Sequence, residues 1–139
     1  MMGLSPTVDR LEQKGFSKVA GVVEWAGLKS APAHSPALFV MPMRAAAEPN
    51  RLNGAHDQRV AETLRVVIVI KPKSLVAGKP SEELKTEVDK VIDALTGWSH
   101  PDACTPCDYA GGALLSADGW GIAWAIDFRT AWRLRKGTQ

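Results

Sequence analysis

His100, Cys104 and Cys107 are spaced like the ligands of a metal ion, in the pattern His100-x-x-x-Cys104-x-x-Cys107. Structural zinc takes four nitrogen or sulfur ligands in a tetrahedron, usually from two such pairs of residues. This segment supplies three ligands, so a fourth would come from a distant residue: His34, His56, Asp102 or Asp108. We therefore predict no metal site and interpret the cysteines as free thiols. His100, Cys104 and Cys107 are kept as the candidate ligands of the less favoured alternative, a bound metal.

Other catalytic chemistry finds little support in the residue pattern. A redox cysteine pair stands at a helix N-terminus after a strand, whereas Cys104 and Cys107 precede a predicted strand. The three histidines fall in predicted loops, and the chain has no GxSxG or HExxH motif. Gly78-Lys79-Pro80 lacks the spacing of a phosphate-binding loop. We predict no enzyme, no catalytic residue and no cofactor, with a small metal-binding or enzymatic domain as the alternative class.

The C-terminal segment concentrates positive charge in Arg129, Arg133, Arg135 and Lys136. Such a segment either contacts phosphates or is a solvated strand face that discourages aggregation, and we favour the second interpretation. The whole chain has 17 basic and 15 acidic residues, a net charge of +2, which does not indicate a nucleic-acid-binding protein. For Asp127 we expect an ion pair with Arg129 or Arg65.

Length and composition indicate one globular domain over residues 1–139. Hydrophobic residues make up 45% and charged residues 23%, close to globular averages. The longest apolar stretch, residues 66–70, is far shorter than the ~20 residues that span a bilayer, so we expect no membrane contact. The first residues do not resemble a signal peptide, and we expect synthesis in the cytoplasm.

Two helices are predicted. Ser5 and Pro6 begin the first, and Gly15 ends it with Phe16 packed back on Leu11. The second spans residues 81–96, with Ser81 as its N-cap and Gly97 beyond its end. Its apolar positions form one stripe, which consists of Leu84, Val88, Val91, Ile92 and Leu95.

Strands are predicted at residues 18–25, 37–43 and 59–71. Pro42 cannot donate to a sheet hydrogen bond, so its strand lies at an edge or ends there. Residues 44–57 are polar and rich in turn formers, and we predict a flexible polar loop.

A C-terminal hairpin is predicted around a turn at Asp118-Gly119. Its register pairs Tyr109 with Phe128, Gly111 with Ile126, Ala113 with Trp124 and Leu115 with Ile122. The return strand alternates so regularly that it exceeds the usual length, and residues 129–139 are predicted to extend beyond the body. The fold class is α+β, an antiparallel sheet with two helices on one face.

The order of these features resembles the tail terminator proteins of long-tailed, siphophage-type bacteriophages. The resemblance rests on the short first helix, the strand LFVMP at residues 38–42 and the polar loop after it. It continues through the long strand at residues 64–70, the helix end ALTGW at residues 94–98 and the hairpin strand YAGGALL at residues 109–115. Together these features cover about residues 6–135, and the cysteine loop stands outside the pattern.

The resemblance implies a structural protein of the virion, at the head-proximal end of the tail. Such terminators form a hexameric ring on the tail tube, stop its polymerisation and present the surface that joins the head connector. DNA passes through the ring without specific binding, and the family has no catalytic residues. Another head–tail completion protein is the alternative.

Interfaces between subunits or with partners are predicted in the polar loop and in the C-terminal extension. Trp132 lies past the paired part of the predicted hairpin, which makes it the candidate interface anchor. The full set of candidates is Arg44, Arg51, Asn53, Arg129, Trp132, Arg133 and Arg135.

Overall fold

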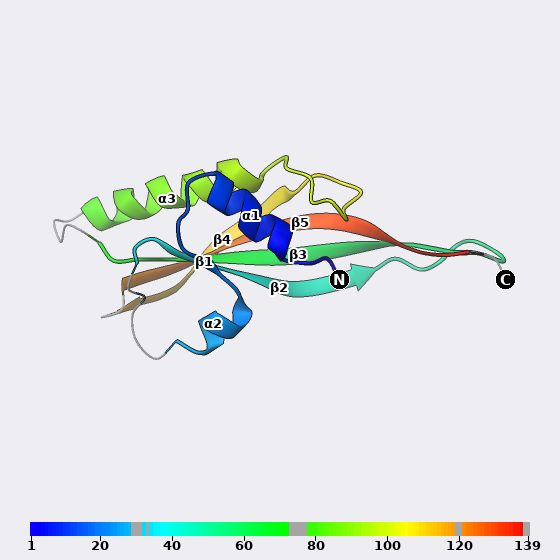
Figure 1. Cartoon of the computed structure of the whole chain (residues 1–139), viewed down its shortest axis with the longest axis horizontal. Helices are drawn as coiled ribbons and strands as arrows, with labels where there is room; N and C mark the ends of the chain where they lie inside the picture. The colour runs from blue at the N-terminus through cyan, green and yellow to red at the C-terminus, as the bar shows by residue number, and fades with distance from the viewer. Residues whose placement is uncertain (29–31, 33, 73–77, 119–120, 138–139) are drawn as a thin grey trace.

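A five-stranded sheet and three helices make up the described residues of the protein (Figure 1). The computed structural model describes residues 1–28, 32, 34–72, 78–118 and 121–137. The strand order across the sheet is β1-β2-β3-β5-β4. The elements in chain order are α1 (Ser5–Gln13), β1 (Val19–Ala20), α2 (Val22–Ala26), β2 (Ala37–Ala47), β3 (His56–Ile70), α3 (Lys79–Leu95), β4 (Asp108–Asp118) and β5 (Gly121–Lys136).

β3 is the central strand and fixes which side chains share a face. It pairs with β5 without interruption, from His56 opposite Lys136 to Ile70 opposite Ile122. Directly opposed residues point to the same side of a sheet, and successive residues to opposite sides. Even-numbered positions of β3 and β5 therefore share one face, and odd-numbered positions share the other.

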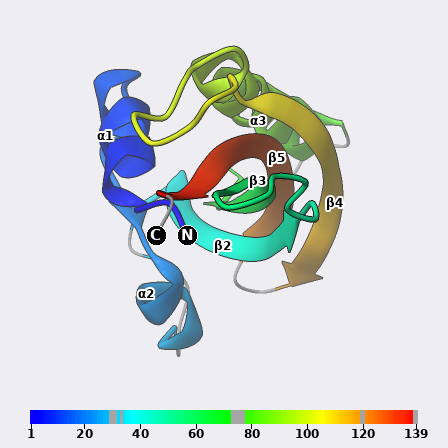
Figure 2. The ribbon, with the colours of Figure 1, turned by 90° about the vertical axis from the view of Figure 1, so that its right-hand side faces the viewer.

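The helices cover the two faces unequally, as Figures 1 and 2 show. α1 and α3 lie on the even-numbered face, where Leu11 and Leu95 pack with Val66, Ile68 and Ile126. The apolar stripe predicted for α3 is confirmed, since all five of its residues belong to or border this core. α2 lies on the opposite side, where Trp25 packs on Phe39 with ring centroids 5.2 Å apart. The α+β class with two helices on one face is confirmed, and α2 is an addition.

The strand predicted at residues 18–25 is wrong beyond Ala20. The carboxylate of Glu24 accepts a hydrogen bond from the Gly21 N–H at 3.0 Å, which caps the start of a helix instead of extending a strand. β1 pairs parallel to β2, so the sheet is mixed, not wholly antiparallel.

The end of α1 is confirmed as a Schellman motif. Phe16 N–H donates to the Leu11 carbonyl at 3.2 Å, Gly15 N–H donates to Glu12, and Gly15 has the left-handed φ of +102° that this motif needs. The first helix begins at Ser5, as predicted, but the predicted capping role of Ser5 is wrong: Leu4 is the N-cap, and its carbonyl accepts from Val8. The predicted N-cap at Ser81 is also wrong, because α3 begins at Lys79 after Gly78, two residues before it.

Residues 44–59 and 129–136 form an arm that projects beyond the helices, toward the right of Figure 1. The predicted polar loop at residues 44–57 is wrong at both ends, because β2 continues to Ala47 and β3 already begins at His56. Residues 48–55 alone connect them, and the Asn50 side chain holds this connection through bonds to Leu52, Ala55 and Asp57. The predicted C-terminal extension is likewise part of the sheet as far as Lys136.

Irregularities in strand pairing alter the predicted registers. Pro42 lies where β2 is an edge strand, as predicted, since β1 pairs with Leu38 and Phe39 alone. In the hairpin, Tyr109 opposite Phe128 is confirmed. The other three predicted pairs are wrong, because register shifts between Tyr109 and Gly111 and between Leu114 and Ser116 move the pairing by one residue each. Asp118 pairs with Gly121 and belongs to the strand, while the predicted turn residue Gly119 lies outside the described residues.

Candidate functional site

An arginine-rich surface covers the odd-numbered face of the arm, and we call it the arginine face. One row across the sheet contains Arg44, Thr63 and Arg129, because Thr63 is opposite both arginines. Farther out, Arg59 is opposite Arg133. At the next odd position Arg135 is opposite Asp57. The arginine face thus consists of Arg44, Arg59, Arg129, Arg133 and Arg135.

A bulge in β2 turns Arg44 onto this face. Pro42 is opposite Leu64, but Arg44 is opposite Thr63, so Met43 is an extra residue in the strand. With regular pairing Arg44 would be opposite Glu62, on the even-numbered face. The proline therefore stands beside the irregularity that brings Arg44 into line with Arg129.

The arm is strongly positive. It contains seven basic and two acidic side chains, a net charge of +5, whereas the rest of the chain has ten basic and thirteen acidic side chains, a net charge of −3. Asp57 lies 3.8 Å from Arg133 and 3.4 Å from Arg135, and Glu48 lies 3.8 Å from Arg59. Arg44 and Arg129 are exposed, and neither forms an ion pair within the described part of the chain.

The inner end of the arginine face is closed by an ion pair between Arg65 and Asp127. The guanidinium donates through Nε at 2.8 Å and through Nη2 at 3.1 Å, and three-quarters of each side chain is covered. These hydrogen bonds, with the negative charge of Asp127, raise the pKa of Arg65 above its usual value. The sequence expectation that Asp127 pairs with Arg129 or Arg65 is resolved in favour of Arg65.

The opposite face of the arm holds Trp132, which the sequence suggested as an interface anchor. Its indole N–H donates to the buried carboxylate of Glu62 at 3.3 Å, and the Met2 N–H donates to the same carboxylate. Trp132 is half-buried and faces away from the arginine face. This contact gives the tryptophan a role within the subunit, and its predicted interface role stays a prediction.

The two remaining interface candidates lie in the loop at the end of the arm. Arg51 lines a cleft of about 210 Å³ together with Glu48, Pro49, Leu52, Asp57, Arg59 and Arg133. Asn53 is exposed in the same loop. The structure therefore brings Arg44, Arg129, Arg133 and Arg135 together on one face. Arg51 shares its cleft with Arg133 of that face, and Asn53 lies in the loop beyond it.

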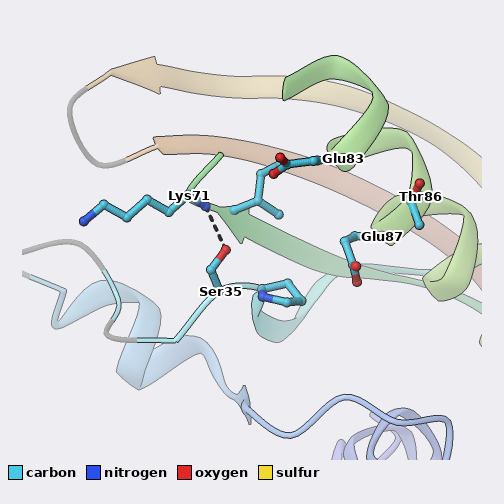
Figure 3. A pocket seen from close by; sticks show the side chains of 7 residues that line it. Ser35, Lys71, Glu83, Thr86 and Glu87 are labelled. Atoms are coloured by element: carbon cyan, nitrogen blue, oxygen red, sulfur yellow. Dashed lines mark hydrogen bonds between the residues drawn. The ribbon is translucent and has the colours of Figure 1, made fainter. Parts of the chain in front are cut away.

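A second cavity of about 210 Å³ opens at the other end of β3 (Figure 3). Glu83, Thr86 and Glu87 of α3 line one wall, and Ser35 accepts a hydrogen bond from the Lys71 N–H at 2.8 Å on the other. No histidine or cysteine is among its described lining residues. The cavity therefore does not combine a nucleophile with an imidazole base.

His100 and Cys107 are buried in the connection between α3 and β4, whereas Cys104 is exposed there. The Nε2 of buried His100 lies 2.7 Å from the Gly3 carbonyl, and its Nδ1 accepts from the Asp102 N–H, so both ring nitrogens are engaged by backbone. Within the described ranges, no group of three or more His, Cys, Asp or Glu residues could hold a metal ion. Burial, and then the negative charge of Asp108, raises the pKa of Cys107 to about 11, so it is a poor thiolate ligand at neutral pH.

Sequence reasoning missed Arg59 as a member of the arginine face. The signal was present, because Arg59, Ala61 and Thr63 alternate with apolar or buried positions of the same strand. It was not recognised because Arg59 is the first residue of the predicted strand. Its position opposite Arg133 becomes clear only from the pairing of β3 with β5.

Comparison with known proteins identifies the family of this chain. A family model described as phage tail terminator protein matches residues 1–139. No curated protein matches the chain.

Across the residues that the structure covers, every helix is too short or too polar to cross a membrane.

Proposed function

Because the chain belongs to the phage tail terminator family, which makes it a structural protein of the phage tail, we propose that its copies form a ring that caps the tail tube. The ring ends tube polymerisation at the set length and then presents the surface that joins the head connector. Six copies form the ring, as the resemblance to siphophage terminators implies. The partners are a second copy of this chain, the tail tube protein and the connector.

The observation that carries this proposal is the arm, with the two open edges of the sheet. Beyond Phe39, β2 pairs with β3 alone, and β4 pairs with β5 alone along its eleven residues. β4 is exposed over nearly its whole length, including Tyr109, Leu114 and Leu115. A closed ring needs two different surfaces on each subunit that fit each other. The open edge of β2, which continues along the arm, and the open edge of β4 supply two such surfaces on opposite sides of β3 and β5.

Open strand edges of this length favour an oligomeric protein over a monomeric one. An unpaired edge presents backbone N–H and C=O groups to any other chain, and monomeric proteins normally shield it. The described part of β4 contains no lysine, arginine or proline, and its charged residues, Asp108 and Asp118, stand only at its two ends. In a ring the edge is covered by the neighbouring subunit or by the tube.

Deletion of the coding sequence from the phage tests the function. Tails made without the protein are expected to be irregular in length and not joined to heads, and supply of the intact chain restores them. Electron microscopy of the particles measures both properties. Joined tails of normal length in the deletion strain contradict the proposal. Tails of normal length that stay unjoined support the second candidate, a head–tail completion protein that acts after length control.

Native mass spectrometry of the purified chain, alone and with tail tubes, tests the ring. A sixfold mass in either sample is expected. A monomer in both samples contradicts ring formation, whatever the phage experiment shows.

A further inference from the structure

We propose that the arginine face of the arm binds the phosphate backbone of double-stranded DNA without reading its sequence. No ligand site is otherwise assigned to this surface, and the proposal goes beyond the capping function. It rests on the composition, charge and alignment of the arginine face.

The side chains of the arginine face suit phosphate. All five cations are arginines, whose planar guanidinium binds a phosphate through two parallel hydrogen bonds. Arg44 and Arg129 lie on either side of Thr63 and form no ion pair in the described ranges, although Asp108 is opposite Arg129. Two guanidinium groups and a hydroxyl in one row provide donors for an anion.

The alignment of the arginines suits an extended polyanion. The row at Thr63 and the row at Asp57 are six residues apart on β3, which corresponds to about 20 Å of strand. Over that length each strand of a DNA duplex presents about six phosphates. A single small anion would leave most of the arginine face unoccupied, whereas a duplex laid along the arm can engage all of it.

The positions between the arginines argue against a protein partner and against single-stranded DNA. Ala46, Ala61 and Ala131 form the row between Thr63 and Arg59, so this part of the arginine face has no large apolar side chain. Protein interfaces gain most of their affinity from tryptophan, tyrosine and arginine anchors that fill well-packed, desolvated pockets, and a row of alanines forms no such pocket around these arginines. Proteins that hold single strands stack bases on aromatic rings. The aromatic residue of the arm, Trp132, lies on the opposite face.

Fluorescence anisotropy with a labelled 20-base-pair duplex of random sequence tests the proposal. If the five arginines each contact one phosphate, log K falls with log salt at a slope of about −4.5, so affinity drops about 500-fold between 50 and 200 mM salt. The double variant Arg44→Gln/Arg129→Gln is expected to bind at least about tenfold more weakly at 50 mM salt and to reduce the slope by about 2. An unrelated duplex is expected to bind as well as the first.

A matched control removes the same charge elsewhere. Lys14→Gln/Lys18→Gln takes two exposed cations from the body and is expected to bind DNA as the unaltered chain does. Circular dichroism and thermal unfolding of both double variants confirm that they fold.

Several results would overturn the proposal: no binding by the unaltered chain at 50 mM salt, binding that is insensitive to salt, or equal losses in the two double variants. Loss of self-association by the arginine variant, with no DNA binding by the unaltered chain, assigns the arginine face to a protein interface instead. Tail capping by the variant is scored separately by microscopy. Normal tails with lost DNA binding leave the capping function intact. Deletion-like tails from a variant that still binds DNA assign the arginines to tail assembly and overturn the DNA proposal, whereas the capping function itself is contradicted only by joined tails of normal length in the deletion strain.

Discussion

Arg65 and Asp127 face each other across β3 and β5 and form a two-bond ion pair that divides the odd-numbered face of the sheet. On the body side the next row contains Val67 and Ala125, which are buried, and Val67 packs in the core that α2 borders. On the arm side the next row contains Arg44, Thr63 and Arg129. Asp127 thus compensates the positive charge of Arg65. The uncompensated positive charge of this face begins on the arm side of the ion pair.

Removal of the Asp127 carboxylate is expected to destabilise the fold. Asp127→Ala leaves a largely covered guanidinium without its partner, which costs about 1–3 kcal/mol. The free energy of unfolding from urea titration measures the loss. Asp89→Ala is the control, since Asp89 pairs with Lys85 on the exposed surface of α3 and should cost less than about 0.5 kcal/mol beyond helix propensity. Equal losses in the two variants would contradict the role given to Asp127.

Trp132 is expected to contribute to stability through Glu62. Trp132→Phe keeps most of the ring but removes the indole donor from a buried carboxylate, which costs about 1–3 kcal/mol. A double-mutant cycle with Glu62→Gln isolates the contact, and we expect a coupling of about 1 kcal/mol or more. Purely additive losses would mean that the tryptophan acts by packing. Unchanged self-association of a Trp132→Ala variant, which removes the ring, would remove Trp132 from the interface candidates.

Gly112 is expected to tolerate no side chain. A Cβ at this position would lie 2.8 Å from Trp124 Nε1 and 3.3 Å from the Ala125 carbonyl, so alanine forces the indole or the strand to shift. Gly112→Ala should cost about 1–3 kcal/mol in thermal or urea unfolding. Gly3→Ala provides the comparison, because a Cβ there has no described atom within 4 Å. A stable Gly112→Ala protein would show that Trp124 can move aside at little cost.

The two cysteines are expected to differ in reactivity. Cys104 is exposed, whereas Cys107 is buried and its pKa is raised to about 11. At pH 8 the thiolate fraction of Cys107 is then about 0.1%, and it increases about tenfold per pH unit until the pKa is reached. Iodoacetamide at pH 8 should label Cys104 alone in the folded protein and both residues in denaturant, as mass spectrometry of peptides can show. Equal labelling of the folded protein would contradict the burial of Cys107.

Local patterns predicted the parts of the fold that local physics controls. Gly15 and Phe16 specify the end of α1 without any distant contact. The apolar stripe of α3, which ends at Leu95, follows from the spacing of its own residues and packs on the core. The arm was missed because polarity at residues 44–57 was interpreted as a loop. The side chains of Arg44, His56 and Asp57 are polar because no helix covers them, yet the backbone of residues 44–47 is paired with β3 and that of residues 56–57 with β5.

The arginine face was predicted only in fragments for a related reason. Alternation assigned Arg129, Arg133 and Arg135 to one side of a strand, but the side taken by Arg44 depends on the bulge at Met43. A one-residue bulge reverses every later side chain, and its position is decided by pairing with a distant strand.

The hydrogen bonds of the His100 ring also depend on a distant partner, because its Nε2 bonds to the Gly3 carbonyl.

The uninterrupted pairing of β3 with β5 also determines when the chain can fold during translation. β3 leaves the ribosome about fifty residues before its longer neighbour begins, and until then its inner edge has no partner. At the usual 5–20 residues per second, the central strand waits several seconds for Gly121–Lys136. A nascent chain arrested before β5 therefore keeps an unpaired apolar strand, and holding it by a chaperone over that interval would preserve the yield of assembly-competent subunits.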